Sequence, residues 1–314
     1  MNVLVTGATG FVGSAVIRQL SLEPDKCAIA ALRHDSTKLP NQIKKVIVGD
    51  LLASTDYSSA LKGVNVVIHA AARVHVMSDD AGDPLSEFRK VNVEGTLNLA
   101  RQSAKAGVKR FIFISSIKVN GEGTQGTPFT PDDAINTNDP YGLSKWEAEQ
   151  GLLALAEETG IEVVIIRPPL IYGPGVKANF MKMIQWVHKG VPLPLGAVEN
   201  RRSLIALDNL VSFIVHCLDH PRASNEVFLV SDGEDVSTPQ LLRKVAEALG
   251  KQVRLIPVPV KFIRFVAGVL GKKDVIERLL GSLQVDSSKA QKLLGWSPVT
   301  DIDEQLRKTI EAWK

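Results

Sequence analysis

The sequence is poor in cysteine, in aromatic residues and in surplus charge of either sign. Of its 314 residues, two are cysteine and 5% are aromatic, and the formal net charge is +3. Cys27 and Cys217 lie far apart in apolar runs. This predicts buried thiols in a reducing compartment, hence a cytoplasmic protein, rather than a disulfide framework. The small net charge, carried by scattered basic residues, argues against a nucleic-acid partner.

Long hydrophobic runs and metal-ligand spacings are also missing. The most apolar late segment, residues 262–270, is interrupted by Arg264 and is far shorter than the roughly 20 residues of a membrane span. It predicts an amphipathic helix under a lid or at a dimer contact, so a homodimer fits the sequence. No charged and then apolar stretch precedes the first strand pattern, which predicts no signal peptide. The six histidines lack a spacing such as HExxH, so no metal is expected.

What the sequence does contain is an alternation of short apolar runs with longer helical patterns. Near-continuous apolar runs are typical of parallel strands that are buried on both faces. Their alternation with helices predicts βαβ units, and so an α/β fold with a doubly wound parallel Rossmann sheet. The expected strands are residues 3–6, 27–32, 45–48, 66–69, 111–115 and 163–167, and the expected helices include 13–22, 85–106 and 141–159.

The texture of the chain changes after Arg167, where prolines and glycines become frequent and the elements become shorter and irregular. We expect residues 1–167 to form an NAD(P)-binding Rossmann domain. Residues 168–314 are expected to form mainly a smaller C-terminal substrate lobe, with crossovers to the main sheet allowed.

A glycine-rich turn at residues 7–13 joins the first strand to the first helix. Gly7 allows a sharp turn, Gly10 lets a pyrophosphate approach the backbone, and Gly13 lets the helix pack close to the strand. The helix N-terminus offers N–H groups and a positive dipole end to phosphates. A glycine motif alone is weak evidence, but this one lies between a strand and a helix. The context favours a dinucleotide site that includes Phe11 and Val12.

The end of the second strand distinguishes NAD from NADP. An acid about 20 residues past the glycines would bind the ribose hydroxyl of NAD. This chain has Arg33 there, 20 residues after Gly13. A guanidinium suits a 2′-phosphate, and Ser36 could donate a second hydrogen bond. The pattern favours NADP(H). NAD(H) stays open, because Asp35 could still reach a ribose and Arg33 could be a solvated surface residue.

Tyr141 and Lys145 are spaced four residues apart, which places both on one face of a helix. A phenol is a poor acid or base at neutral pH, and a nearby ammonium would lower its pKa toward the working range. Ser116 follows an apolar strand at its carboxyl end, where ligands bind in such sheets, and would hydrogen-bond the reacting oxygen. A YxxxK match alone is common. The glycine turn, strand-end serine and YxxxK in this order predict a catalytic triad of Ser116, Tyr141 and Lys145.

Over nearly its full length the chain resembles the extended short-chain dehydrogenases/reductases, in particular the nucleotide-sugar epimerase, dehydratase and reductase group of the UDP-glucose 4-epimerase type. The resemblance rests on the GxxGxxG turn, on YxxxK, and on residues 167–175, which are similar to an RPxxxYGPG segment at the sugar site. Residues 116–121 match an SxxVYG stretch with Asn120 in place of tyrosine, which puts local substrate contacts in doubt. Further cofactor residues implied by the resemblance are Asp50, Leu51, Ala70, Ala71, Ala72 and Asn92.

The resemblance also implies residues that bind a nucleotide-sugar substrate. Asn179 starts a helix that would bind a diphosphate, and Leu193 and Leu195 belong to a strip that would enclose a uracil ring. Arg201 would pair with the pyrophosphate, for which Arg278 is a second candidate. The alternative for Arg201 is an ordinary solvated arginine.

These features favour reduction of a 4-keto nucleotide sugar, with UDP as the expected nucleotide, because Arg33 suggests a dissociating NADPH. The close alternative is a UDP-sugar 4-epimerase of the UDP-glucose or UDP-N-acetylglucosamine type. A ketone reductase for a hydrophobic substrate fits Arg201 less well, and a non-enzymatic redox sensor does not need the Tyr-Lys pair. Dehydration is disfavoured because no Asp-Glu pair follows Ser116.

Overall fold

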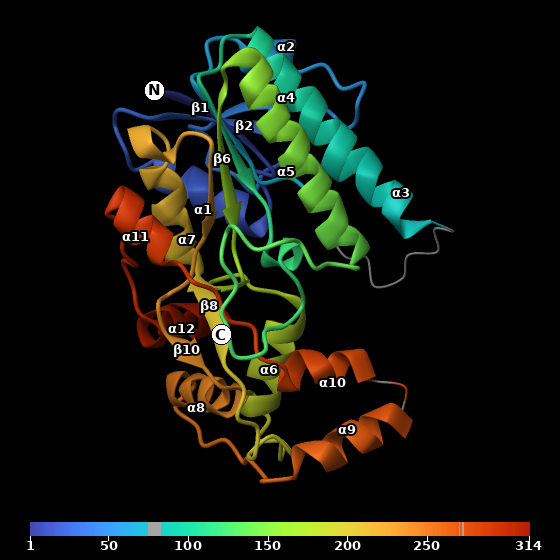
Figure 1. Ribbon diagram of the computed structural model, residues 1–314. Coiled ribbons are helices and arrows are strands. Elements are labelled where there is room, and N and C mark those ends of the chain that lie inside the picture. Colours follow the sequence, from blue (N-terminus) through green and yellow to red (C-terminus); the bar gives the residue numbers. More distant parts are fainter. Residues whose placement is uncertain (75–82, 270, 272) are drawn as a thin grey trace.

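The computed structural model describes residues 1–74, 83–269, 271 and 273–314. A large sheet with helices on both faces lies above a smaller lobe (Figure 1). The large sheet has seven strands in the order β3-β2-β1-β4-β5-β6-β9, and each neighbouring pair is parallel. The predicted doubly wound α/β fold is therefore confirmed. Its strands are β1 (Asn2–Thr6), β2 (Cys27–Leu32), β3 (Lys44–Ile47), β4 (Val66–His69), β5 (Arg110–Ile114), β6 (Glu162–Arg167) and β9 (Glu226–Leu229).

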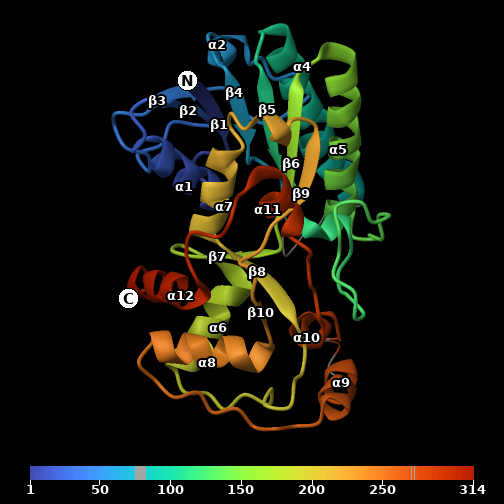
Figure 2. The same cartoon turned by 60° about the vertical axis from the view of Figure 1, so that its left-hand side comes forward.

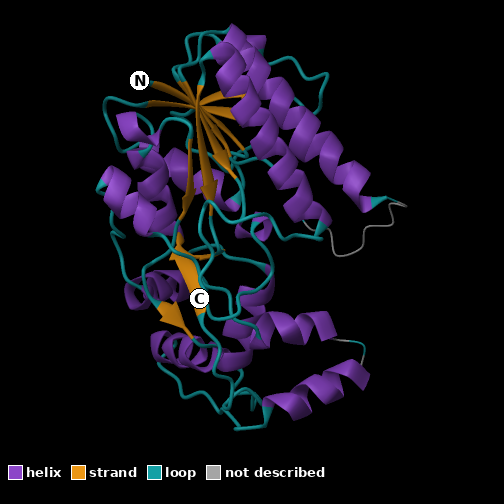
Figure 3. Cartoon of the chain, in the orientation of Figure 1, coloured by secondary structure: helices purple, strands orange, loops and turns teal. Residues whose placement is uncertain are grey.

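The apolar runs of the central strands fill the space between two layers of helices. Helices α1 (Phe11–Leu20), α7 (Leu207–His216) and α11 (Ser288–Leu294) pack on one face of the large sheet. Helices α2 (Ser58–Leu61), α4 (Thr96–Lys105) and α5 (Pro140–Thr159) pack on the other. Figure 2 shows the sheet between these layers, and Figure 3 shows its strands in orange with helices on either side.

Two expectations about burial fail at the margins of this sheet. Strand β3 is an edge strand whose residues are half-buried or exposed, because it has a partner on one side only. Cys27 is the first residue of β2 and is exposed, so the prediction that both thiols are buried is wrong for it. Cys217 is buried, and burial raises the pKa of its thiol.

The second half of the chain contributes to both parts of the molecule. It returns α7, β9 and α11 to the large sheet, and it builds the smaller lobe around a second sheet of order β10-β8-β7. We therefore keep the division after residue 167 as a proposed functional boundary only. The lobe contains β7 (Leu170–Tyr172), α6 (Ala178–His188), β8 (Arg202–Ala206), β10 (Asp235–Val236), α8 (Thr238–Ala248), α9 (Val260–Val269), α10 (Lys273–Leu280) and α12 (Ile302–Glu311).

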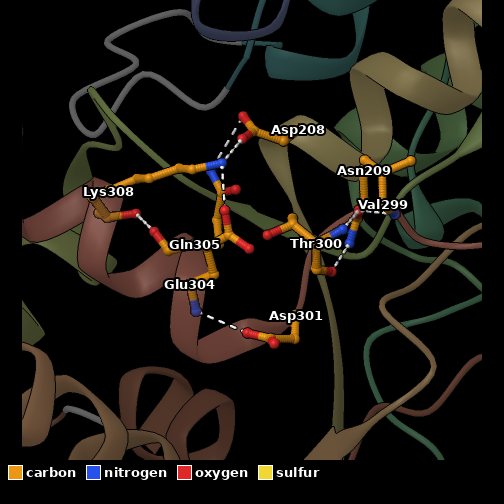
Figure 4. A network of polar contacts seen from close by, with 9 residues as sticks. Asp208, Asn209, Val299, Thr300, Asp301, Glu304, Gln305 and Lys308 are labelled. Atoms are coloured by element: carbon orange, nitrogen blue, oxygen red, sulfur yellow. Dashed lines mark hydrogen bonds and ion pairs between the residues drawn. The ribbon is translucent and has the colours of Figure 1, made fainter.

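Polar contacts attach the C-terminal segment of the lobe to α7 (Figure 4). The side-chain oxygen of Asn209 accepts hydrogen bonds from the N–H groups of Val299 and Thr300, at 2.7 and 2.9 Å. Its amide nitrogen donates to the Thr300 carbonyl at 2.9 Å. Lys308 of α12 reaches Asp208 at 3.0 Å. Because α7 packs on the large sheet, these contacts tie the lobe to it. Within the described ranges, no helix is long and apolar enough to cross a membrane.

Candidate active site

The glycine turn between β1 and α1 forms a cradle with space that the side chain of any residue other than glycine would occupy. Gly7 has a φ of +65°, and a Cβ on it would lie 2.7 Å from the backbone of Ala70 and Ala71. A Cβ on Gly13 would lie 2.2 Å from the Gly7 carbonyl oxygen. Gly10 is the N-cap of α1, and no side chain in the described parts of the chain caps that end. The cradle therefore fits a dinucleotide, whose phosphates would meet the N–H groups at the start of α1.

Arg33 and Asp50, both expected to bind the cofactor, contact each other. Arg33 Nε lies 3.2 Å from a carboxylate oxygen of Asp50, and both side chains are exposed. The Ser36 hydroxyl accepts a hydrogen bond from the Lys38 N–H at 3.2 Å. The guanidinium of Arg33 is thus paired with an acid, which weakens the case for a dedicated 2′-phosphate site.

Asn92 joins the loop after β4 to helix α5. The expected helix over 85–106 divides into α3 (Pro84–Phe88), a π-helix (Arg89–Gly95) and α4. From the π-helix, the Asn92 amide nitrogen donates to the Arg73 carbonyl and to Ser144 Oγ, both at 3.0 Å. Its side-chain oxygen accepts from the Arg73 N–H at 2.8 Å. A π-turn of this kind is frequent at functional sites, and here it places a buried amide beside α5.

A close approach also fixes the position of Leu51. A Cβ on Gly95 would lie 2.7 Å from the Leu51 carbonyl oxygen, so the loop after β3 rests directly on the end of the π-helix. Ala70, Ala71 and Ala72 leave β4 next to Gly7 as small residues that let backbone lie along the cradle. The cofactor residues implied by the resemblance thus lie around one edge of the sheet.

The structure brings Ser116 and Tyr141 together. Ser116 follows β5 and caps a short 3-10 helix (Ile117–Val119), and its side chain is near enough to Tyr141 to lower the pKa of the phenol. Helix α5 starts at Pro140, and the Asp139 carboxylate caps it by accepting from the Gly142 N–H at 2.9 Å. This start places Tyr141 in the first turn, opposite the end of β5.

Desolvation dominates the electrostatics of the two titratable residues. Burial raises the pKa of Tyr141 to about 12; the Asp139 carboxylate also raises it, and the hydrogen bond with Ser116 opposes the shift. Burial lowers the pKa of Lys145 to about 7, opposed by Glu149. The Lys145 Nζ lies 3.9 Å from the centre of the Phe113 ring. Burial therefore dominates the pKa of Tyr141 in this structure, and the lowering of that pKa by the Lys145 ammonium stays a prediction.

A buried ion pair, missed by the sequence reasoning, lies behind the triad. Glu149 is fully buried and accepts hydrogen bonds from Ser115 Oγ, next to Ser116, and from Arg167 Nη2 at 2.6 Å. Arg167 Nη1 donates to Asn120 Oδ1 at 3.0 Å. Asn120 is fully buried, so its side chain serves as a hydrogen-bond partner of the arginine. The missed signal was the spacing of Glu149, four residues after Lys145 on the same helical face.

The predicted substrate residues are spread over the lobe. Asn179 is exposed at the start of α6, and Arg201 is exposed just before β8. Leu193 and Leu195 are buried in the lobe's apolar core, so only their backbone could meet a base. Arg278 lies in α10, but its side chain is outside the described residues. Their assignment as substrate residues stays a prediction.

Comparison with known proteins fits this geometry. The model of the NAD dependent epimerase/dehydratase family matches residues 3–231. The chain is also 49% identical over 314 residues to a UDP-glucose 4-epimerase of Vibrio cholerae, covering 99% of this chain and 95% of that protein. This chain belongs to the NAD-dependent epimerase/dehydratase family. It is therefore an enzyme of an NAD-dependent family.

Two further similarities span most of the chain. An Escherichia coli O157:H7 N-acetyl-alpha-D-glucosaminyl-diphospho-ditrans,octacis-undecaprenol 4-epimerase is 30% identical over 292 residues, covering 91% of this chain and 83% of that one. The crystal structure of a Bacillus cereus UDP-glucuronic acid 4-epimerase in complex with NAD superposes with a TM-score of 0.80 at 21% identity. That superposition covers 99% of this chain and 98% of the other, and it shows the shared fold.

Proposed function

We propose that this family member is a 4-epimerase of a UDP-linked hexose, of the UDP-glucose or UDP-N-acetylglucosamine type. The observation that carries the proposal is that Ser116, at the end of β5, and Tyr141 and Lys145, on helix α5, lie at the edge of the sheet that holds the glycine cradle. The similarity to the Vibrio cholerae epimerase supports it. The reductase expected from Arg33 is not supported by the comparisons, which favour the alternative.

In this proposal two side chains of the protein bind the sugar C4 oxygen and transfer its proton. Ser116 holds that oxygen by a hydrogen bond, and Tyr141 exchanges the proton with it. The bound dinucleotide supplies the hydride acceptor and donor. Because burial favours the protonated phenol, Tyr141 needs a positive charge nearby in order to accept the proton of the sugar hydroxyl. Lys145 contributes this charge when it is protonated.

The proposed function is tested by identifying the products from UDP-sugars and from 4-keto UDP-sugars, each with and without NADPH. We expect a mixture of C4 epimers from the UDP-sugar without any added reductant. Turnover confined to a 4-keto sugar plus NADPH would establish the reductase instead.

We propose that the cofactor is NAD, held throughout the cycle, and that Arg33 contributes little to its selection. An exposed ion pair such as Arg33–Asp50 is worth at most about 1 kcal/mol, so its loss should disturb the site little. Arg33→Ala should therefore change the Kd for NADH less than about threefold, as measured by fluorescence titration of the apoprotein. NADPH binding at least tenfold tighter than NADH, with that preference lost in Arg33→Ala, would restore the NADP assignment.

We also expect UDP to raise the melting temperature of the protein, because a diphosphate would be paired by Arg201. A charge-assisted hydrogen bond contributes roughly 1.5–3 kcal/mol, so Arg201→Ala should raise the Kd for UDP about 10- to 150-fold. Arg222→Ala, at another exposed arginine outside the proposed site, is the matched control and should leave it unchanged. An absence of any thermal shift with UDP in the unmutated protein would count against a UDP-linked substrate.

A further inference from the structure

Helix α9 exposes an apolar stripe on its outer side. Phe262, Phe265, Val266 and Val269 are 59%, 69%, 37% and 73% exposed. Their spacing of three, one and three residues places them on one side of the helix. Helix α9 lies at the end of the lobe farthest from the large sheet (Figures 1 and 2). The helix that carries the stripe therefore lies far from the large sheet.

The inner side of α9 is already packed. Ile263 and Ala267, one turn apart, are 7% and 5% exposed, and Ile263 belongs to the lobe's apolar core. Arg264 Nε forms an ion pair with Glu277 of α10 at 2.9 Å. These contacts hold the inner side of α9 against the lobe, and its outer stripe stays exposed.

The stretch of chain that includes the stripe is rich in basic residues. Residues 248–273 contain six basic residues and no acidic one, although the whole chain carries a net charge of only +3. Within this stretch Lys251, Arg254 and Lys261 are exposed beside the apolar Ile256, which is 48% exposed. A helix with exposed phenylalanines, flanked in the sequence by lysine and arginine, matches helices that lie in the interface of a bilayer.

We propose that α9 docks this enzyme onto a membrane surface that contains anionic phospholipid. Phe262 and Phe265 enter the boundary of headgroups and acyl chains, while Lys261 and Arg254 meet the lipid phosphates. Contact with a second copy through the same face would bring two cationic segments together, which disfavours a dimer there. The proposal goes beyond the proposed function and does not depend on it.

The test is flotation of the full chain with vesicles of phosphatidylglycerol and phosphatidylethanolamine, compared with vesicles of phosphatidylcholine alone. We expect binding to the anionic vesicles that weakens as salt is raised, and at least tenfold weaker partitioning onto phosphatidylcholine. Phe262→Ser/Phe265→Ser should reduce partitioning onto anionic vesicles at least tenfold. Leu22→Ser/Val299→Ser removes two other exposed apolar side chains as a control and should bind like the unmutated protein.

Two further measurements distinguish membrane docking from a folding defect and from dimer formation. Circular dichroism and turnover of a UDP-sugar without vesicles should be unchanged in the double phenylalanine variant. In a Phe265→Trp variant, anionic vesicles should shift the added tryptophan emission to the blue. Failure of the unmutated protein to float, equal flotation of the double phenylalanine variant, or a dimer by light scattering that only this variant loses would each overturn the proposal.

Discussion

Replacing Tyr141 by phenylalanine is expected to reduce turnover about 10²- to 10⁴-fold, the usual contribution of a general acid–base group. The substitution removes one hydroxyl from the first turn of α5, near Ser116. The Asp139 cap and the packing of the ring against Phe88 stay in place, so the helix should start at the same residue. Steady-state assays of the variant give the measurement.

The same variant should bind NAD with a Kd close to that of the unmutated protein, because the glycine cradle lies on β1 and α1. Isothermal titration on the apoprotein provides this control. Turnover within a factor of a few of the unmutated rate would mean that Tyr141 does not handle the proton, and the proposed chemistry would fail.

Replacing Arg167 by leucine should have the largest effect on stability. It leaves the carboxylate of Glu149 fully buried without its partner, and breaking a buried pair in this way costs about 3–5 kcal/mol. We therefore expect the free energy of unfolding to fall by that amount in urea titrations. The double variant Glu149→Leu/Arg167→Leu should recover much of the loss, because a buried pair can often be replaced by apolar groups at little cost.

The matched control is Lys244→Leu, which breaks the more exposed pair of Lys244 with Asp303, 2.8 Å apart. This change should cost less than about 1 kcal/mol. If Arg167→Leu costs no more than Lys244→Leu, the buried pair does not support α5 and β6 as the structure indicates.

The sheet could be predicted because each of its strands is signalled by a short stretch of neighbouring residues. A parallel strand needs a short apolar run, and the glycine turn at residues 7–13 has to lie between a strand and a helix. The π-helix at Arg89–Gly95 could not be predicted, since seven residues are too few to separate its period from that of an α-helix. Cys27 was misplaced because an apolar run does not reveal that its first residue lies at the exposed end of the strand.

The site was predicted less completely because its energetics are not local. Glu149 and Arg167 meet across two elements, and only the fold shows that Asn120 closes their shell. For Tyr141, the sequence reveals the nearby charge of Lys145 but not the desolvation that outweighs it. Leu193 and Leu195 match a substrate strip, yet the lobe's apolar core takes up their side chains.

The most direct test of the account uses a UDP-hexose that carries deuterium at C4, incubated with the purified enzyme and no added dinucleotide. A 4-epimerase that keeps its NAD returns the hydride to the other face of the same carbon. We therefore expect NMR to show the C4 epimer with its deuterium retained, and Tyr141→Phe should form almost none of it. No epimer, together with turnover only when a 4-keto sugar and NADPH are supplied, would contradict the account.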